Sequence, residues 1–372
     1  MLVGVPKEIK PQENRVGMNP DSVKELVSAG HKVIVETNAG QGIRASDDEY
    51  RKAGASIVAT AKDVFEKADM VVKVKEPQAV ECAMLREGQV LFTYLHLAAD
   101  SKQAQGLMNS GCVAIAYETV TGRNGGLPLL APMSEIAGRM GPQMAAFYGQ
   151  KHLGGTGRLM SGVPGVEPAE VLVIGGGVSG FNAARVAVGM GARVTILERS
   201  PDRIRFLDEY FGTSANVVTS TAASLERYSA TADSIIGAVL IPGAAAPKLI
   251  SRADLKNMKE GCVVVDIAID QGGCLETSKA TTHDKPVYEV DGVVHYCVAN
   301  MPGAFPQSST AALNHATLPY TLELANKGWR MALTENPHLR AGLNVFEGKI
   351  TYKAVAEALN MDYKEPVFAC AA

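Results

Sequence analysis

Runs of consecutive apolar residues alternate along the chain with segments in which apolar residues recur every three or four positions. The runs are short and rich in valine, isoleucine and leucine, which predicts strands buried on both faces of a sheet. The segments with the longer period predict amphipathic helices. This alternation of strands and helices favours a mostly parallel sheet covered by helices on both faces.

The first third of the chain shows the alternation clearly. Predicted strands occupy residues 2–8, 32–37, 69–77, 89–97 and 112–120, and predicted helices occupy residues 19–30, 46–54, 61–68 and 101–111. The first of these helices has Asn19 as a plausible N-cap, Pro20 in its first turn and Gly30 just past its end.

A second alternating unit begins near residue 170. Its predicted strands are 170–177, 192–198, 234–240 and 261–268, with helices at 182–191 and 203–212. Before it, residues 132–152 predict a long connecting helix and residues 153–168 a glycine-rich loop. Helical patterns return at 314–329 and 352–361, and such a tail often crosses back to the first domain.

These patterns predict an α/β protein of two Rossmann-like doubly wound domains, joined by long helices, with a cleft between them. We expect a discontinuous substrate domain of residues 1–130 plus 308–372, and a contiguous nucleotide-binding domain of residues 131–307.

The composition narrows the class of protein. A chain of 372 residues is too long for one ordinary core, and 47% hydrophobic with 20% charged residues is typical of a globular protein. A net charge of −3 offers no electrostatic footprint for nucleic acid. No apolar run approaches the roughly 20 residues of a membrane span, and the N-terminal run is too short for a signal peptide. The six cysteines form no C-x-x-C pair, which favours a reducing, cytoplasmic location.

The most specific motif is a glycine loop at the start of the second unit. Gly175, Gly177 and Gly180 form a G-x-G-x-x-G pattern that follows an apolar strand and opens an alanine-rich helix. Glycines permit a tight turn and a close approach of the backbone to a pyrophosphate, and the N-terminus of a helix favours that anion. The loop therefore predicts a dinucleotide site.

The end of the next strand predicts which dinucleotide. Glu198 follows the loop by about 20 residues, where a carboxylate accepts hydrogen bonds from ribose hydroxyls. A carboxylate repels a 2′-phosphate, so NAD is favoured over NADP, although Arg199 and Arg203 nearby soften this preference. Ser220, Gly237 and Ala238, at later strand ends, would leave room for ribose and nicotinamide.

Basic residues near strand ends of the first domain are candidates for holding a carboxylate. Arg15 lies between the first strand and the first helix, and Lys75 lies at the end of strand 69–77. A solvated loop arginine is the commoner case, and Lys73 is expected at a solvated edge. Arg15 and Lys75 together would hold a small carboxylate, arginine through its planar fork and lysine as a point charge.

His96 and Asp270 are the candidates for proton transfer. His96 lies at the end of an apolar strand, and on position alone a core histidine is the more common explanation. Asp270 stands beside two glycines, where an Asx turn is an equally good one. Together with Arg15 and Lys75, however, both residues follow strands at the edges that would line a cleft between the domains.

Several stretches, in order along the chain, resemble the alanine dehydrogenase family, which includes the NAD-binding subunit of transhydrogenase. They include GVPKEIKPQENRV, DMVVKVKEP, LFTYLHLAAD, PMSEIAGRM, VVVDIAIDQGG and HYCVANMPGA. The resemblance covers essentially the whole chain. It implies reversible oxidative deamination of L-alanine to pyruvate and ammonium, with NAD as hydride acceptor, in a homohexamer without nucleic-acid or membrane partners.

The resemblance also implies roles for single residues. Arg15 and Lys75 would bind the substrate carboxylate and carbonyl oxygen. His96 would be the general acid/base, and Asp270 would position the amino group or water and assist proton transfer. The implied NAD contacts, with the glycine loop, are Ser134, Gly175, Gly177, Val178, Ser179, Gly180, Glu198, Arg203, Ser220, Val239, Leu240, Ile267, Ala268, Ile269, Asp270, Val298, Ala299, Asn300 and Met301.

Departures from the family pattern are few: NRVGMNP replaces the more usual NRVALTP beside Arg15, with little consequence expected, and two others concern the cofactor and a metal. Position 198 is Glu where many members carry Asp, and the longer arm should keep the ribose contact. Some relatives place a divalent metal near the C-terminal helix through an acid and a histidine. The matching pair here is Glu323 and Lys327, and because lysine is a poor ligand we expect no metal site.

Three other functions fit parts of the sequence. The transhydrogenase subunit shares the architecture but normally lacks a catalytic His/Asp pair and works with membrane partners. A dehydrogenase that condenses lysine with a keto acid is a second alternative. A non-catalytic NAD sensor would keep the glycine loop but need not keep His96 or Asp270. The presence of Lys75, His96 and Asp270 favours the alanine dehydrogenase interpretation.

Overall fold

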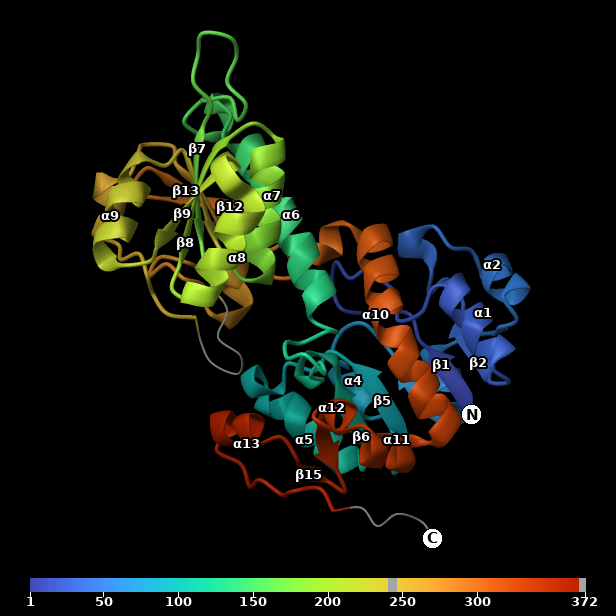
Figure 1. Ribbon diagram of the computed structural model, residues 1–372. Coiled ribbons are helices and arrows are strands. Elements are labelled where there is room, and N and C mark those ends of the chain that lie inside the picture. Colours follow the sequence, from blue (N-terminus) through green and yellow to red (C-terminus); the bar gives the residue numbers. More distant parts are fainter. Residues whose placement is uncertain (240–245, 368–372) are drawn as a thin grey trace. The chain divides into compact units, whose positions relative to one another are not determined.

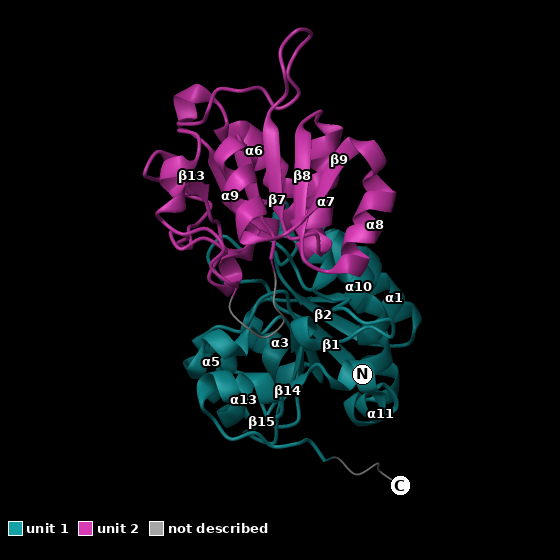
Figure 2. Cartoon of the chain, turned by 60° about the vertical axis from the view of Figure 1, so that its left-hand side comes forward, with its two compact units in different colours: residues 1–133, 305–372 teal, residues 134–304 magenta. Residues whose placement is uncertain are grey.

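The computed structural model describes residues 1–239 and 246–367, and the chain divides into two compact units (Figure 1). Unit 1 comprises Met1–Met133 and Phe305–Ala372, and unit 2 comprises Ser134–Ala304 (Figure 2). Within the described residues, no helix is both long and apolar enough to cross a membrane.

Unit 1 is built on a mainly parallel sheet with the strand order β15-β14-β6-β5-β4-β1-β2-β3. Its strands are β1 Leu2–Val5, β2 Lys32–Glu36, β3 Ser56–Val58, β4 Met70–Val72, β5 Val90–Thr93, β6 Val113–Ala116, β14 Leu343–Phe346 and β15 Lys349–Ile350. Its helices are α1 Pro20–Ser28, α2 Asp47–Lys52, α3 Ala61–Lys67, α4 Ala79–Cys82, α5 Ser101–Ser110, α10 Pro306–Lys327, α11 Trp329–Glu335, α12 Pro337–Arg340 and α13 Lys353–Leu359.

The tail of the chain completes the sheet of unit 1. β14 pairs antiparallel with β6, and β15 pairs antiparallel with β14, whereas the other neighbours in this sheet are parallel. The sequence pattern did not predict this hairpin, because strands of four and two residues carry too little periodicity. Strand 69–77 is also shorter than predicted: β4 ends at Val72, so Lys75 lies in the segment beyond it.

Unit 2 contains a sheet with the order β12-β13-β11-β10-β7-β8-β9. Its strands are β7 Glu170–Ile174, β8 Arg193–Glu198, β9 Ala215–Thr219, β10 Ser234–Gly237, β11 Val263–Asp266, β12 Val287–Val290 and β13 Val293–Tyr296, and its helices are α7 Val178–Gly189, α8 Pro201–Phe211 and α9 Ala222–Thr231. All neighbours are parallel except β12 and β13. The prediction of two doubly wound α/β sheets is confirmed.

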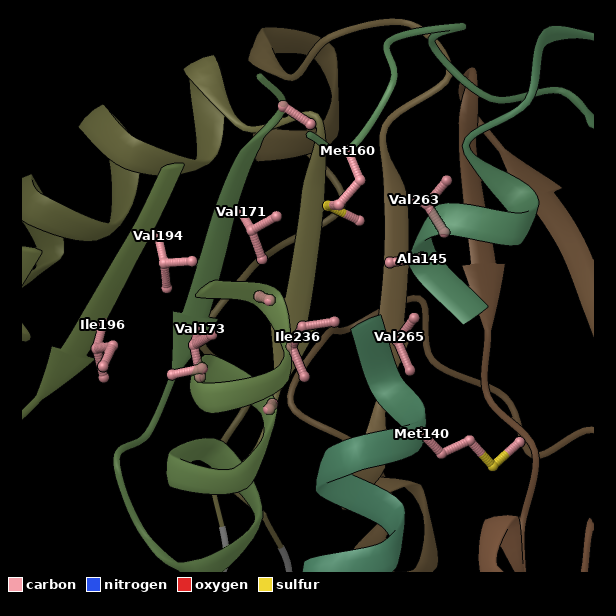
Figure 3. Packing of buried hydrophobic residues seen from close by; sticks show 14 of the residues in the cluster. Met140, Ala145, Met160, Val171, Val173, Val194, Ile196, Ile236, Val263 and Val265 are labelled. Atoms are coloured by element: carbon pink, nitrogen blue, oxygen red, sulfur yellow. The ribbon is translucent and has the colours of Figure 1, made fainter. Parts of the chain in front are cut away.

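The long helix predicted over 132–152 is α6 Ala131–Tyr148, and it packs on one face of the second sheet. Valines at alternate positions of β7 and β11 point to the same side, where Met140 and Ala145 of α6 pack against them (Figure 3). Fully burying each such apolar side chain stabilises the fold by roughly 1.5–3 kcal/mol. The small side chains of Ala183, Ala184 and Ala187 let α7 approach the same face closely.

A histidine is enclosed in this sheet. His295 on β13 is fully buried. Its Nδ1 donates to the carbonyl of Val293 at 2.9 Å, and its Nε2 accepts from the hydroxyl of Thr277 at 2.8 Å. Burial lowers the pKa of this imidazole, and the Val293 carbonyl only partly offsets the effect. Both ring nitrogens are satisfied in the neutral form.

We predict that this histidine makes unit 2 sensitive to acid. Below about pH 6.5 the imidazole of this histidine is protonated in the unfolded chain but stays neutral in the folded chain, because its folded-state pKa is lower. The free energy of unfolding therefore falls as the pH falls, by at most about 1.4 kcal/mol per pH unit. His295→Gln should therefore reduce the drop in melting temperature between pH 7.5 and 5.5. His152→Gln, at an exposed position, serves as the control. Equal drops in all three proteins would contradict the assignment.

Candidate active site

The glycine loop of unit 2 forms the turn from β7 into α7. Gly175 has a φ of +94°, a conformation that favours glycine. A Cβ added at Gly180 would lie 1.7 Å from the carbonyl oxygen of Gly175, so the loop itself requires glycine at 180. A Cβ added at Gly177, the N-cap of α7, would meet nothing within 4 Å. The loop thus leaves open space at the N-terminus of a helix, where phosphate binds.

Two charged side chains hold the peptide of Gly176 from both sides. Oε2 of Glu198 accepts the Gly176 N–H at 2.7 Å, while Nε of Arg203 donates to the Gly176 carbonyl at 2.6 Å. The other oxygen of Glu198 accepts from the N–H groups of Arg199 and Ser200, at 2.7 and 2.9 Å. Burial lowers the pKa of Arg203, with Glu198 opposing, and its guanidinium lies 4.4 Å over the ring of Phe206. Glu198 therefore shapes the loop as well as standing at the end of β8.

The other predicted cofactor residues of unit 2 lie mostly at the carboxyl ends of its strands. Ser134 stands on α6; Val178 and Ser179 open α7; Ser220 follows β9; Val239 follows β10; Ile267, Ala268, Ile269 and Asp270 follow β11; Val298, Ala299, Asn300 and Met301 follow β13. Leu240 lies outside the described residues. Gly237 has an internal explanation, because a Cβ there would lie 2.5 Å from Sγ of Cys274.

Asp266, rather than Asp270, does the work of an Asx turn. The buried carboxylate of Asp266 accepts the N–H groups of Ala268 and Cys274, at 3.1 and 2.8 Å, and the hydroxyl of Ser278 at 2.5 Å. Asp270, in the following 3-10 turn, is exposed. Asp266 thus forms an Asx turn after β11, and the exposed residue Asp270 follows within that turn.

In unit 1, Arg15 is buried rather than solvated. Only 2% of the residue is exposed, and its Nε and Nη2 donate to the two oxygens of Glu13 at 2.7 and 2.6 Å. Nη1 also lies 3.1 Å from Sδ of Met133. Burial opposes the charge, but the bonds to Glu13 outweigh it and raise the pKa of Arg15. The guanidinium is a fixed cation, oriented by a bidentate pair.

Lys73 and Lys75 differ more than their spacing predicts. The expectation of a solvated edge for Lys73 is wrong: its side chain is fully buried between the carboxylates of Glu8 and Glu81. Lys75 lies beyond the end of β4, and its carbonyl accepts from the hydroxyl of Thr93 at 3.0 Å. Burial opposes ionisation of Glu76, but the ammonium groups of Lys75 and Lys10 outweigh it and lower the pKa of that carboxyl.

His96 is not a core histidine. Its side chain is 44% exposed, and its backbone is left-handed, with φ of +50° and ψ of +37°. Residues with side chains adopt this conformation rarely, and it is frequent at functional sites. Glu118, just after β6, stabilises it by accepting the His96 N–H at 2.6 Å and the Leu95 N–H at 3.2 Å. The imidazole stacks on Tyr94, with ring centroids 5.7 Å apart.

Unit 1 thus brings Arg15, Lys75 and His96 to one edge of its sheet. Lys75 and His96 leave the neighbouring parallel strands β4 and β5 at the same end. Tyr94, on which His96 stacks, is buried and lies close enough to Arg15 for the guanidinium and the phenol to influence each other electrostatically. Sequence reasoning missed the supporting acids. Glu13 lies two residues before Arg15, and Glu118 follows β6, the next parallel strand. Both acids could therefore have been predicted from their places in the sequence.

The residues considered for a metal form an ion pair instead. Nζ of Lys327 lies 3.1 Å from Oε1 of Glu323 and 2.8 Å from Oε2 of Glu335. Across residues 1–239 and 246–367, no group of three or more histidine, cysteine, aspartate or glutamate side chains is placed to hold a metal ion.

The geometry of unit 2 defines a class of protein. A doubly wound sheet, a glycine loop that opens onto a helix N-terminus, and a carboxylate at the end of the next strand are the parts of a dinucleotide-binding domain. The open space at Gly177 fits a pyrophosphate there. Unit 2 therefore has the architecture of a dinucleotide-binding domain.

Comparisons with known proteins supply the family. The model of the alanine dehydrogenase/PNT N-terminal domain matches residues 4–137, and that of the C-terminal domain matches residues 141–353. The chain belongs to the alanine dehydrogenase/PNT family, and the resemblance drawn from its motifs is confirmed.

Individual relatives are similar over nearly the full length. An alanine dehydrogenase of Halomonas elongata is 56% identical over 365 residues, which is 98% of each chain. A solved L-alanine dehydrogenase structure matches with a TM-score of 0.93 and 49% identity, covering 97% of this chain and 99% of that one. A transhydrogenase structure from Sinorhizobium meliloti matches with a TM-score of 0.82 and 28% identity, covering 94% and 100%.

We predict that Gly177→Ala separates cofactor binding from folding. Because the added methyl meets no atom of the chain, the melting temperature should stay the same, while NADH binding, followed by fluorescence, should weaken about tenfold or more, or about 1.4 kcal/mol. Gly189→Ala, in the same helix and also in open space, should leave both unchanged. Unaltered NADH affinity in Gly177→Ala would refute a close approach of the pyrophosphate.

Proposed function

We propose that this protein catalyses the reversible oxidative deamination of L-alanine to pyruvate and ammonium, with His96 as general acid/base and Asp270 assisting. The proposal rests mainly on the conformation and exposure of His96. Its imidazole is partly exposed, its backbone is left-handed, and Glu118 accepts its N–H. It lies at the same end of the unit 1 sheet as Lys75 and near Arg15.

The family supplies the class of reaction. Membership of the alanine dehydrogenase/PNT family, and full-length identity to alanine dehydrogenases, make the chain an NAD(H)-dependent alanine oxidoreductase. NAD, when bound, accepts the hydride that leaves Cα of the substrate. The glycine loop would hold its pyrophosphate, and Glu198 the hydroxyls of its ribose.

In this proposal, Arg15 and Lys75 bind and orient the substrate. Arg15 is a permanent cation whose direction is set by Glu13, so its positive charge is already in place to attract a carboxylate. Lys75 supplies a point charge for the carbonyl oxygen, which becomes more negative as pyruvate is converted to the tetrahedral carbinolamine. Together they fix Cα, which is what hydride transfer needs most.

His96 manages the protons. The amino group of alanine must be neutral before Cα can give up a hydride, so a base has to remove one proton first. An imidazole titrates near neutral pH and suits this task, and later returns protons as water attacks the imine carbon and ammonium leaves. Glu118 holds the backbone of His96, which keeps the imidazole on the exposed side. Asp270 of unit 2 would position the amino group or water.

The first test is turnover. NADH formation from L-alanine at alkaline pH should be measurable, and His96→Ala should lower kcat by a factor on the order of 10² or more while NADH binding persists. His96→Asn is the matched variant, because asparagine tolerates the left-handed conformation but cannot act as a base. We expect it to be as slow as His96→Ala. A His96→Asn enzyme near the wild-type rate would mean that only the backbone conformation matters.

The second test concerns the cofactor. Glu198→Ala should raise the KM for NAD by more than the KM for NADP, because it removes both the ribose acceptor and the charge that repels a 2′-phosphate. Glu198→Asp keeps the charge and should retain the preference for NAD. The structure shows that Glu198 also holds three backbone N–H groups, so some loss for both cofactors is expected. Equal losses for NAD and NADP in Glu198→Ala would count against the ribose contact.

A further inference from the structure

A buried carboxylate connects the charges inside unit 1 to the backbone of Lys75. Oε1 of Glu8 accepts the Val74 N–H at 2.6 Å and the Lys75 N–H at 3.4 Å, and its Oε2 lies 3.1 Å from Nζ of Lys73. We propose that Glu8 is a positioning residue for substrate binding, which fixes the backbone from which Lys75 reaches the substrate. This inference rests on the proposed role of Lys75.

The cluster around Lys73 is unusual for its burial. The side chains of Glu8, Lys73 and Glu81 are exposed by 2%, 0% and 1%, and Nζ of Lys73 lies 2.8 Å from Oε1 of Glu81. Burial raises the pKa of Glu8, although Lys73 partly offsets it. Apolar residues in place of buried ion clusters often stabilise a protein as well or better. A gain in stability is therefore a weak explanation for the presence of this cluster. A better explanation is that the cluster fixes the local conformation of the chain segments that carry it.

The two carboxylates differ in what their remaining oxygen does. Oε2 of Glu81 accepts the Gln78 N–H at 2.8 Å and so fixes the start of α4. Glu8 instead accepts N–H groups of the segment between β4 and α4, beyond the last residue of β4. One carboxylate thus holds the residue proposed to bind substrate, and the other holds a helix that follows it. The two form a natural pair for comparison.

The loop that carries Glu8 also holds the neighbours of Lys75. Lys10 forms an ion pair with Glu76, and Glu13 in the same loop orients Arg15. On the opposite side, the hydroxyl of Thr93 on β5 donates to the Lys75 carbonyl. The segment between residues 8 and 15 therefore sets the position of both cations that would hold the substrate carboxylate and carbonyl.

Two variants of the full-length enzyme distinguish the effect of the length of the Glu8 side chain from the effect of its charge. Glu8→Asp keeps the charge beside Lys73 but withdraws the acceptor by one methylene. Glu8→Gln keeps the acceptor and loses the charge. We expect Glu8→Asp to raise the KM for L-alanine and pyruvate about tenfold, since small displacements of a positioning group are costly, with the KM for NAD unchanged. Glu8→Gln should keep both substrate KM values within about twofold of wild type, even if its melting temperature falls.

The control is Glu81→Asp, which makes the same change on the other side of Lys73. It should lower the melting temperature as Glu8→Asp does but leave the substrate KM values near wild type. An unchanged KM in Glu8→Asp, or an equal rise in Glu81→Asp, overturns the inference. If Glu8→Asp does not fold, Glu8→Met replaces it, because methionine fills a similar volume without an acceptor for the Val74 and Lys75 N–H groups. A raised substrate KM in Glu8→Met supports the inference and an unchanged one overturns it, and a raised KM in Glu8→Gln would show that charge rather than reach matters.

Lys75→Ala distinguishes this inference from the function on which it rests. If Lys75→Ala leaves the substrate KM values unchanged, the role proposed for Lys75 is wrong and the inference falls with it. If Lys75→Ala raises them while Glu8→Asp does not, the role of Lys75 stands and only the role of Glu8 is refuted.

Discussion

A charge buried in a protein needs an opposite charge or hydrogen-bonding groups beside it, and this constraint organises the part of unit 1 that carries Arg15 and Lys73. Arg15 is enclosed with Glu13, and Lys73 with Glu8 and Glu81. Each pair forces one segment of chain into a single position relative to another. The cations that would meet the substrate are therefore placed by interactions formed before any ligand arrives, which is the condition for electrostatic catalysis without reorganisation.

The same principle appears in unit 2 with a different partner. There the carboxylate of Glu198 is satisfied by backbone N–H groups, one of which belongs to the glycine loop itself. Arg203 holds the carbonyl of that same peptide. The loop is thus shaped by side chains that come from the end of β8 and from α8, as well as by its glycines.

Long regular patterns were enough to predict much of this structure. Helix α6, predicted over 132–152, spans Ala131–Tyr148, and α8, predicted over 203–212, spans Pro201–Phe211. Arg15, Lys75 and His96 could be identified as candidates because the binding and catalytic residues of α/β proteins lie near the carboxyl ends of strands. What the sequence could not tell is which charges are buried. Lys73 and Lys75 are two positions apart, but one is enclosed because Glu8, 65 residues away along the chain, reaches it. The strands β14 and β15 were not predicted, because they are too short to show a hydrophobic pattern.

The pairing of β14 with β6 also fixes the order in which the molecule can be completed. Unit 1 begins at the N-terminus, but its sheet is finished by residues that follow all of unit 2. As the chain emerges from the ribosome, β6 must remain an open sheet edge until the segment near Leu343 has been made, and such edges invite wrong pairing. Unit 2 is contiguous and is fully synthesised first. Unit 2, which carries the glycine loop, can therefore fold before the last strands of unit 1 have been synthesised.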